Sequence, residues 1–151
     1  MTPIGSAHAG RINRLNQFLG RQLGDTAIVS VQNPIRLAER PEPQPDIAVL
    51  RPRADYYAEG HPTAADVLLA IELADTSLAY DRDVKVPLYT RAGIPEAWLF
   101  DVPGESITRY ADPVDGTDRL VERARRGQRL ASTVLPALVL EVDAVLGRRS
   151  P

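Results

Sequence analysis

The sequence predicts a mixed α/β fold, with a central sheet flanked by helices. Two observations predict it. A near-continuous apolar run at residues 67–73 is typical of a central strand that is covered on both faces. Around this run the order of patterns is helix, strands, one helix and more strands, which is a mixed sheet with a packed helix and not a repeating strand–helix array.

The opening part of the chain predicts a helix and then a strand. In residues 8–24, HAGRINRLNQFLGRQLG, apolar side chains recur at helical spacing. Ser6 is a suitable N-cap for this helix and Gly24 a suitable stop. The β-branched, alternating AIVSVQ at residues 27–32 predicts a strand, which we expect to pair with IRLA at residues 35–38.

The middle of the chain predicts two strands and a second long helix. DIAVLRP at residues 46–52 is a strand pattern, separated from the central strand by a loop rich in polar residues, glycine and proline. DRDVKVPLYTRAG, residues 81–93, predicts a helix with Asp81 as N-cap and Gly93 as stop. Because Pro87 lies inside this helix, we expect a short first segment or a kink.

The last third predicts strands and short turns. EAWLFDV, residues 96–102, is a strand pattern, and after the turn PGES we expect residues 107–112 to pair back as a hairpin. One or two short strands follow within residues 119–132, and the segment 136–147 predicts a strand with a short turn of helix.

Length and composition bound the class of protein. The 151 residues, 44% of them apolar and 25% charged, suit one globular domain. We expect it to span residues 1–147, with a disordered tail at 148–151. We expect no membrane association, since no apolar run approaches the roughly 18 residues of a membrane span. The absence of cysteine excludes disulfides and thiolate zinc sites and fits a reducing, cytoplasmic compartment.

The charge distribution leaves the basic segment near the end open to two interpretations. The net charge of −2 does not by itself indicate a nucleic-acid binder. ERARRGQR, residues 122–129, is nevertheless rich in arginine. It is either a solvated hairpin or a patch that faces phosphates.

Two carboxylates and a lysine form the candidate site. Asp46 opens one strand, and Glu72 lies near the end of the next, so both can meet at one sheet edge if the strands are neighbours. Mutual repulsion there would be relieved by a divalent metal such as Mg²⁺, which prefers oxygen ligands and keeps several waters. Lys85, one loop later, could stabilise a pentavalent phosphate. Each of the three could equally fill an ordinary role, because three residues with free gaps form a weak pattern.

The segments PDIAVL and IELADTSLAYDRDVKVPLYTRAGIPEAWLFD carry a resemblance to a known family. From about Pro45 to Asp101 the chain resembles the Uma family of restriction-endonuclease-like proteins, in the PD-(D/E)XK nuclease superfamily. The resemblance implies a restriction-endonuclease-like sheet and a Mg²⁺-dependent endonuclease that acts on DNA, with Mn²⁺ as a possible substitute and a homodimer as the expected assembly.

The resemblance also implies roles for single residues. Asp46 and Glu72 would bind the metal. Lys85 would be the catalytic lysine, moved onto the following helix because the usual position, two residues after the second acid, holds Ala74. Asp81 matches the aspartate of the family's YDR motif, which we interpret as a helix cap or lysine partner first and a ligand second.

Three further residues are candidates for supporting roles. His8 matches a histidine often found at the start of the first helix in the family, and with Asp81 it is a candidate for the second shell of the site. Arg51 and Arg53, just after the Asp46 strand, are candidates for phosphate binding.

One departure from the family, together with the acidic net charge, keeps a rival function open. The family usually has a hairpin-forming segment before the first helix, which we expect this chain to lack, either because it is shortened or because its true start lies upstream. A second departure, Ala97 in place of a common tyrosine, is interpreted as structural. The rival to an active nuclease is an inactive nucleic-acid- or protein-binding module on the same fold. A structural domain with coincidental carboxylates would have no metal affinity.

Overall fold

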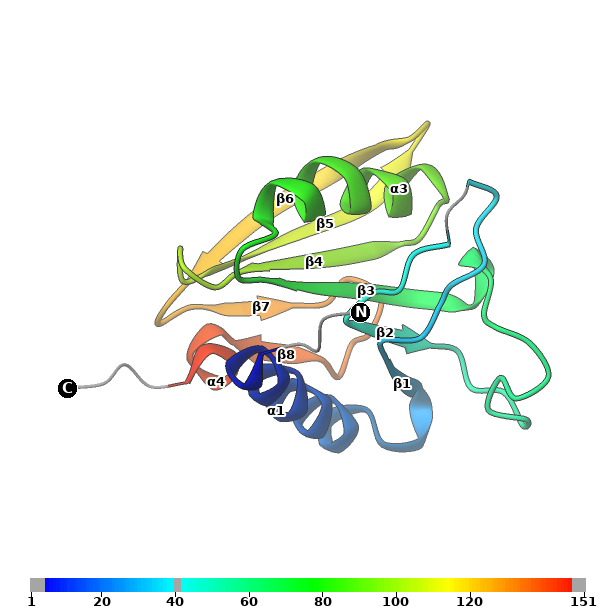
Figure 1. Cartoon of the computed structure of the whole chain (residues 1–151), viewed down its shortest axis with the longest axis horizontal. Helices are drawn as coiled ribbons and strands as arrows, with labels where there is room; N and C mark the ends of the chain where they lie inside the picture. Colours follow the sequence, from blue (N-terminus) through cyan, green and yellow to red (C-terminus); the bar gives the residue numbers. More distant parts are fainter. Residues whose placement is uncertain (1–4, 40–41, 148–151) are drawn as a thin grey trace.

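The computed structural model describes residues 5–39 and 42–147, so the predicted tail at 148–151 lies outside the described part of the chain. Its centre is a six-stranded mixed sheet with strands in chain order, β1 to β6. Helix α1 covers one face, and the α2–α3 helical segment covers the other (Figure 1). The predicted mixed sheet flanked by helices is therefore confirmed.

Along the described residues, helical segments and eight strands follow one another. The bounds are α1 Ser6–Leu23, η1 Gly24–Thr26, β1 Ile28–Val31, β2 Ile47–Leu50, η2 Ala64–Asp66, β3 Val67–Ala74, α2 Leu78–Tyr80, η3 Asp81–Lys85, α3 Val86–Arg91, β4 Glu96–Asp101, β5 Ser106–Val114, β6 Thr117–Arg125, β7 Arg129–Ala131, β8 Val139–Glu141 and α4 Val142–Leu146.

Helix α1 matches the predicted helix closely. Its apolar stripe is buried against the sheet and the C-terminal segment, through Ile12, Leu15, Leu19 and Leu23. The predicted cap is wrong by one residue, because Ser6 is already helical and Gly5 occupies the N-cap with an extended backbone. The stop at Gly24 is correct.

Strand β1 pairs with β2 and not with residues 35–38 as predicted. The antiparallel register runs from Ile28 opposite Leu50 to Val31 opposite Ile47. β2 is buried along its whole length, so β1 covers more apolar surface by pairing with β2 than it would by pairing with residues 35–38. Residues 35–38 contribute only an isolated bridge, from Arg36 to Thr63.

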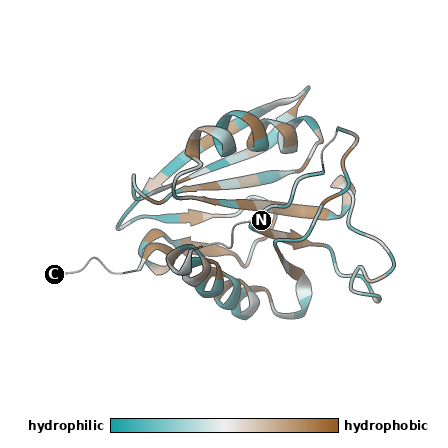
Figure 2. Cartoon of the chain, viewed as in Figure 1, coloured by the Kyte–Doolittle hydropathy of each residue, from teal (hydrophilic) through white to brown (hydrophobic). Residues whose placement is uncertain are grey.

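Strand β3 is the central strand that its apolar run predicts. It pairs antiparallel with β2 and parallel with β4, and seven of its eight residues are buried. Figure 2 shows hydrophobic residues concentrated in β2 and β3. The side chains of these strands enter both layers of the core, since successive residues point to opposite faces.

The second helical segment starts earlier than predicted. It begins at Leu78, so Asp81 lies within the segment and is not its N-cap. A π-helical turn, η3, precedes α3, and Pro87 sits in the first turn of α3. Since proline lacks an N–H and crowds the preceding turn, a wider turn before it is a reasonable accommodation. Gly93 follows the last turn with φ +80°, as expected of a stop.

The antiparallel pairing of β4 with β5 confirms the predicted hairpin. β5 also pairs antiparallel with β6, a nine-residue strand that is longer than the short strands predicted there, and this second pairing was not predicted. β7 and β8 form a separate two-stranded sheet, and α4 packs with α1 in the same core cluster. Within residues 5–39 and 42–147, no helix combines the length and apolar character that crossing a membrane requires.

Candidate active site

The structure brings Asp46 and Glu72 together at one end of the sheet. Asp46 directly precedes β2, and the antiparallel register places it opposite Glu72 on β3. The backbone N–H of Asp46 donates to Oε1 of Glu72 at 2.8 Å, and the N–H of Leu73 donates to Oδ2 of Asp46 at 2.8 Å. Each carboxylate is therefore held by the backbone of the other strand.

Lys85 reaches the same place from the π-helical turn. Its ammonium forms an ion pair with Oε2 of Glu72 and lies 3.5 Å from the carbonyl oxygen of Gln44. The Glu72 side chain is only 1% exposed, whereas that of Lys85 is 18% exposed. Glu72 is therefore shielded from solvent, and its neighbours Lys85 and Asp46 are partly exposed.

Helix α1 contributes two further side chains. Nε2 of His8 lies 3.4 Å from Oδ1 of Asp46. One helical turn later, Arg11 pairs with Asp75, just after β3, at 2.8 Å. The candidate His8 is therefore brought to the site, while Arg11 and Asp75 were not predicted. The available signal was the three-residue spacing of His8 and Arg11, which places both on one face of the helix.

Asp81 lies beside the cluster without capping its helix. Its Oδ2 accepts a hydrogen bond from Oγ of Ser77 at 2.7 Å, and the side chain is buried. Burial raises the pKa of Asp81, against the opposing effects of Ser77 and Lys85. Asp81 also contributes to the raised pKa of Lys85, and its role as partner of the lysine stays a prediction.

Burial governs the electrostatics of the acid–lysine pair. It raises the pKa of Glu72 to about 8, with Lys85 opposing the shift and Asp46 adding to it. For Lys85, burial works against the charged form, but attraction to Glu72, Asp81 and Asp46 outweighs it and leaves the pKa of the ammonium raised. Because burial and the neighbouring Asp46 both disfavour the ionised form of Glu72, a cation bound beside it would stabilise that carboxylate.

The residues present fit a hard divalent cation that takes few of its ligands from the protein. Within the described residues, no group of three histidine, cysteine, aspartate or glutamate side chains is arranged to hold a metal ion. Asp46 and Glu72 nevertheless have one oxygen each that accepts no backbone hydrogen bond, Oδ1 and Oε2, and these oxygens face Nε2 of His8 and the ammonium of Lys85. Mg²⁺ commonly binds through one or two carboxylates and retains its waters.

Arg51 and Arg53 are not brought to this site. β2 runs antiparallel to β3, so residues after β2 lie at the opposite end of the sheet from Asp46. Arg51 donates from its backbone to Asp66, at the start of β3. Arg53 pairs with Asp55 at 2.5 Å and stacks over the ring of Tyr57. Their predicted phosphate role at the carboxylates has no geometric support.

The basic segment 122–129 divides into two parts. Arg126 pairs with Glu105 and Asp143, and Arg129 lies 3.9 Å from Glu141, so these two serve contacts with the C-terminal part of the chain. Arg123 and Arg125 belong to β6 and are exposed. The solvated-hairpin interpretation therefore accounts for half of this segment only.

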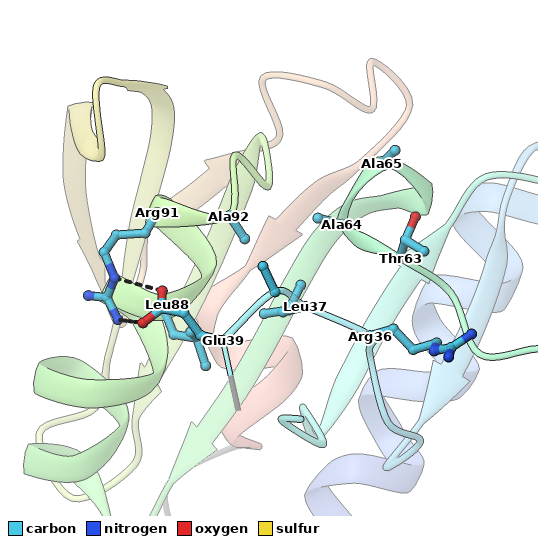
Figure 3. A pocket seen from close by; sticks show the side chains of 10 residues that line it. Arg36, Leu37, Glu39, Thr63, Ala64, Ala65, Leu88, Arg91 and Ala92 are labelled. Carbon is cyan, nitrogen blue, oxygen red and sulfur yellow. Dashed lines mark hydrogen bonds and ion pairs between the residues drawn. The ribbon is translucent and has the colours of Figure 1, made fainter. Parts of the chain in front are cut away.

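A cavity of about 400 Å³ lies elsewhere, between α3 and the segments around residues 36–39 and 63–65 (Figure 3). The ion pair of Arg91 with Glu39 spans one side of it, at 3.0 Å. Neither the two carboxylates nor Lys85 lines this cavity. The cluster of charged groups therefore lies outside this cavity, at the end where β2 begins and β3 ends.

The mixed sheet, with two acids and a lysine at the end of its central strands, has the arrangement expected of a restriction-endonuclease-like fold. Residues 1–143 match the model of the Uma2 family, whose description is "putative restriction endonuclease". The chain belongs to this family.

A solved structure shares the fold. The chain is similar to a crystal structure from Anabaena variabilis, described as a "putative nuclease", with a TM-score of 0.73 and 15% sequence identity. The match covers 97% of this chain and 83% of that one. Comparison with curated proteins gives no match.

Proposed function

We propose that the protein is a Mg²⁺-dependent endonuclease that hydrolyses phosphodiester bonds of DNA. The observation that carries the proposal is the meeting of Asp46, Glu72 and Lys85 at one sheet end, with both acids locked by backbone hydrogen bonds. Two acids and an ammonium in contact can hold a metal and a phosphate side by side. Membership of a nuclease family supports the same chemistry.

Asp46 and Glu72 would hold Mg²⁺, or Mn²⁺ in its place, which when bound supplies a Lewis acid and an activated water for attack on phosphorus. The fixed orientation of the two acids limits the reorganisation needed at the site. Lys85 would stabilise the negative charge that develops on the phosphate oxygens. His8, in contact with Asp46, would hold that carboxylate in place.

The expected setting follows from the same features. A homodimer would place two edge sites on one duplex, since one small sheet offers little surface for DNA. The absence of cysteine suits a reducing compartment, so we place the protein in the cytoplasm.

Metal binding tests the carboxylates directly. Calorimetric titration of the wild type with Mg²⁺ and Mn²⁺ should show binding that Glu72→Gln loses, because the variant removes a charged ligand while preserving its shape. Binding retained by this variant would contradict the assignment of Glu72.

Cleavage of supercoiled plasmid in the presence of Mg²⁺ tests the activity. Asp46→Ala should abolish nicking, and Lys85→Met should reduce it by at least about 10²-fold, the usual cost of losing one group that stabilises the transition state. Circular dichroism of each variant controls for folding. Unchanged nicking by a folded Asp46→Ala would refute the site, and metal binding without cleavage of any nucleic acid would favour the inactive binding module.

A further inference from the structure

The strand register places two exposed arginines on the same side of the sheet as the acidic site. Glu72 lies opposite Leu99, Leu99 opposite Thr108, and Thr108 opposite Arg123. Residues directly opposite one another across neighbouring strands share a face. Arg123 therefore projects from the same face as Glu72, three strand spacings or roughly 14 Å away.

Arg125 occupies the next row toward the end of the sheet. It lies opposite Ser106, which lies opposite Asp101, which in turn lies opposite Ala74 at the end of β3. In Figure 1 these ends of β3, β4 and β6 are all at the left of the sheet. The two arginines are thus aligned with the end at which the carboxylates meet.

The neighbourhood of these arginines leaves them available to a ligand. Within the described residues, the side chain of Arg125 has no ion pair or hydrogen bond. Arg123 donates to Oγ of Ser106 at 3.0 Å and lies 3.8 Å from Asp101, a distance too long for a strong ion pair. Both differ from Arg126, which is tied to two acids.

A third arginine belongs to the helical segment that carries Lys85. Arg82 is exposed on the π-helical turn, three residues before Lys85, and its only ion pair among the described residues is with its neighbour Asp83. Burial raises the pKa of Tyr110 on β5, and Arg82 and Arg123 both oppose that shift. Both arginines therefore lie near Tyr110. An exposed pair such as Arg82 with Asp83 is easily exchanged for a phosphate.

We propose that Arg82, Arg123 and Arg125 form a strip that binds the phosphates flanking the cleaved bond of duplex DNA. The inference rests on the proposed function, because the strip is defined by its distance from the acidic site. One strand of B-form DNA carries a phosphate every 3.4 Å along the axis, so roughly four phosphates span the distance from Glu72 to Arg123. The strip would hold the substrate while Lys85 meets the reacting phosphate.

The experiment measures binding of a fluorescein-labelled 20-base-pair duplex by anisotropy, in Ca²⁺ buffer, over a series of salt concentrations. Arg123→Gln and Arg125→Gln should each raise Kd about five- to tenfold near 100 mM salt, and should lower the slope of log K against log salt by about 0.9. The double variant should lose about twice that slope.

The matched control is Arg21→Gln, which removes the same charge. Arg21 is exposed in the last turn of α1, about 20 Å along the helix from His8. It should leave Kd and slope within twofold of the wild type. Equal slopes for the wild type and the Arg123/Arg125 double variant would overturn the strip, as would equal losses in the Arg21 variant. Calorimetry distinguishes failure of the strip from failure of the proposed function. The Arg123/Arg125 double variant should bind Mn²⁺ as the wild type does, whereas loss of Mn²⁺ binding would mean that the acidic site itself is disturbed.

Discussion

Glu72 shows how one buried residue can link metal binding to pH. Burial raises its pKa to about 8, so below that pH a proton occupies the carboxylate that the metal would need. The group is ionised only as the pH rises through 8. A cation and a proton therefore compete for the same oxygen atoms.

We predict that the affinity for Mg²⁺ rises with pH by up to about tenfold per unit below pH 8 and levels off above it. Titrations at pH 6.5, 7.5 and 8.5 measure this directly. Glu72→Gln, which has no proton to lose, should show weak binding with little pH dependence. A wild-type affinity that is flat across this range would show that Glu72 is ionised throughout.

Two glycines, Gly93 after α3 and Gly20 within α1, differ in the backbone conformation that their elements require. Gly93 follows α3 with φ +80°, a backbone conformation that costs residues with a Cβ, while the space around it is open. Gly20 lies inside α1, also with open space, but with no positive φ. The same substitution therefore has opposite effects at the two sites.

Gly93→Ala should lower the free energy of unfolding by about 1 kcal/mol, whereas Gly20→Ala should raise it by up to about 1 kcal/mol. Urea denaturation followed by circular dichroism measures both, and each variant serves as the control for the other. A stabilising Gly93→Ala would mean that the turn after α3 can relax out of its left-handed conformation.

Sequence periodicity predicted most elements because the apolar side chains that form the core repeat at helical or strand spacing. It did not predict the partner of β1, since pairing across a chain loop is decided by burial in the folded state. It also placed Arg51 and Arg53 wrongly. Proximity in sequence to Asp46 suggested proximity in space, but β2 lies between them and carries the chain from one end of the sheet to the other.

In the candidate site, too, some residues could be predicted from the sequence and others could not. Asp46, Glu72 and Lys85 could be found from residue type and order, and the structure brings all three together. The contact of Arg11 with Asp75 joins the start of α1 to the end of β3, residues that are distant in sequence. Such a contact follows only from how α1 lies on the sheet.

At the scale of the whole molecule, the proposed homodimer is the assembly to test. The monomer mass is 16.5 kDa. Size-exclusion chromatography with light scattering should give twice this mass, and the value should be unchanged in Asp46→Ala, whose substitution lies in the site. A monomer at all concentrations would require a single site to cut each strand in turn.

The hydrogen bonds that join Asp46 to β3 carry a consequence for folding. Because strand side chains alternate between faces, slipping β2 by one residue against β3 would turn Asp46 away from Glu72 and break both backbone bonds. Catalysis would then be possible only in molecules whose central strands have found their correct alignment. The rate at which activity returns during refolding would therefore report when β2 and β3 reach their correct register. The return of secondary structure would report a different step.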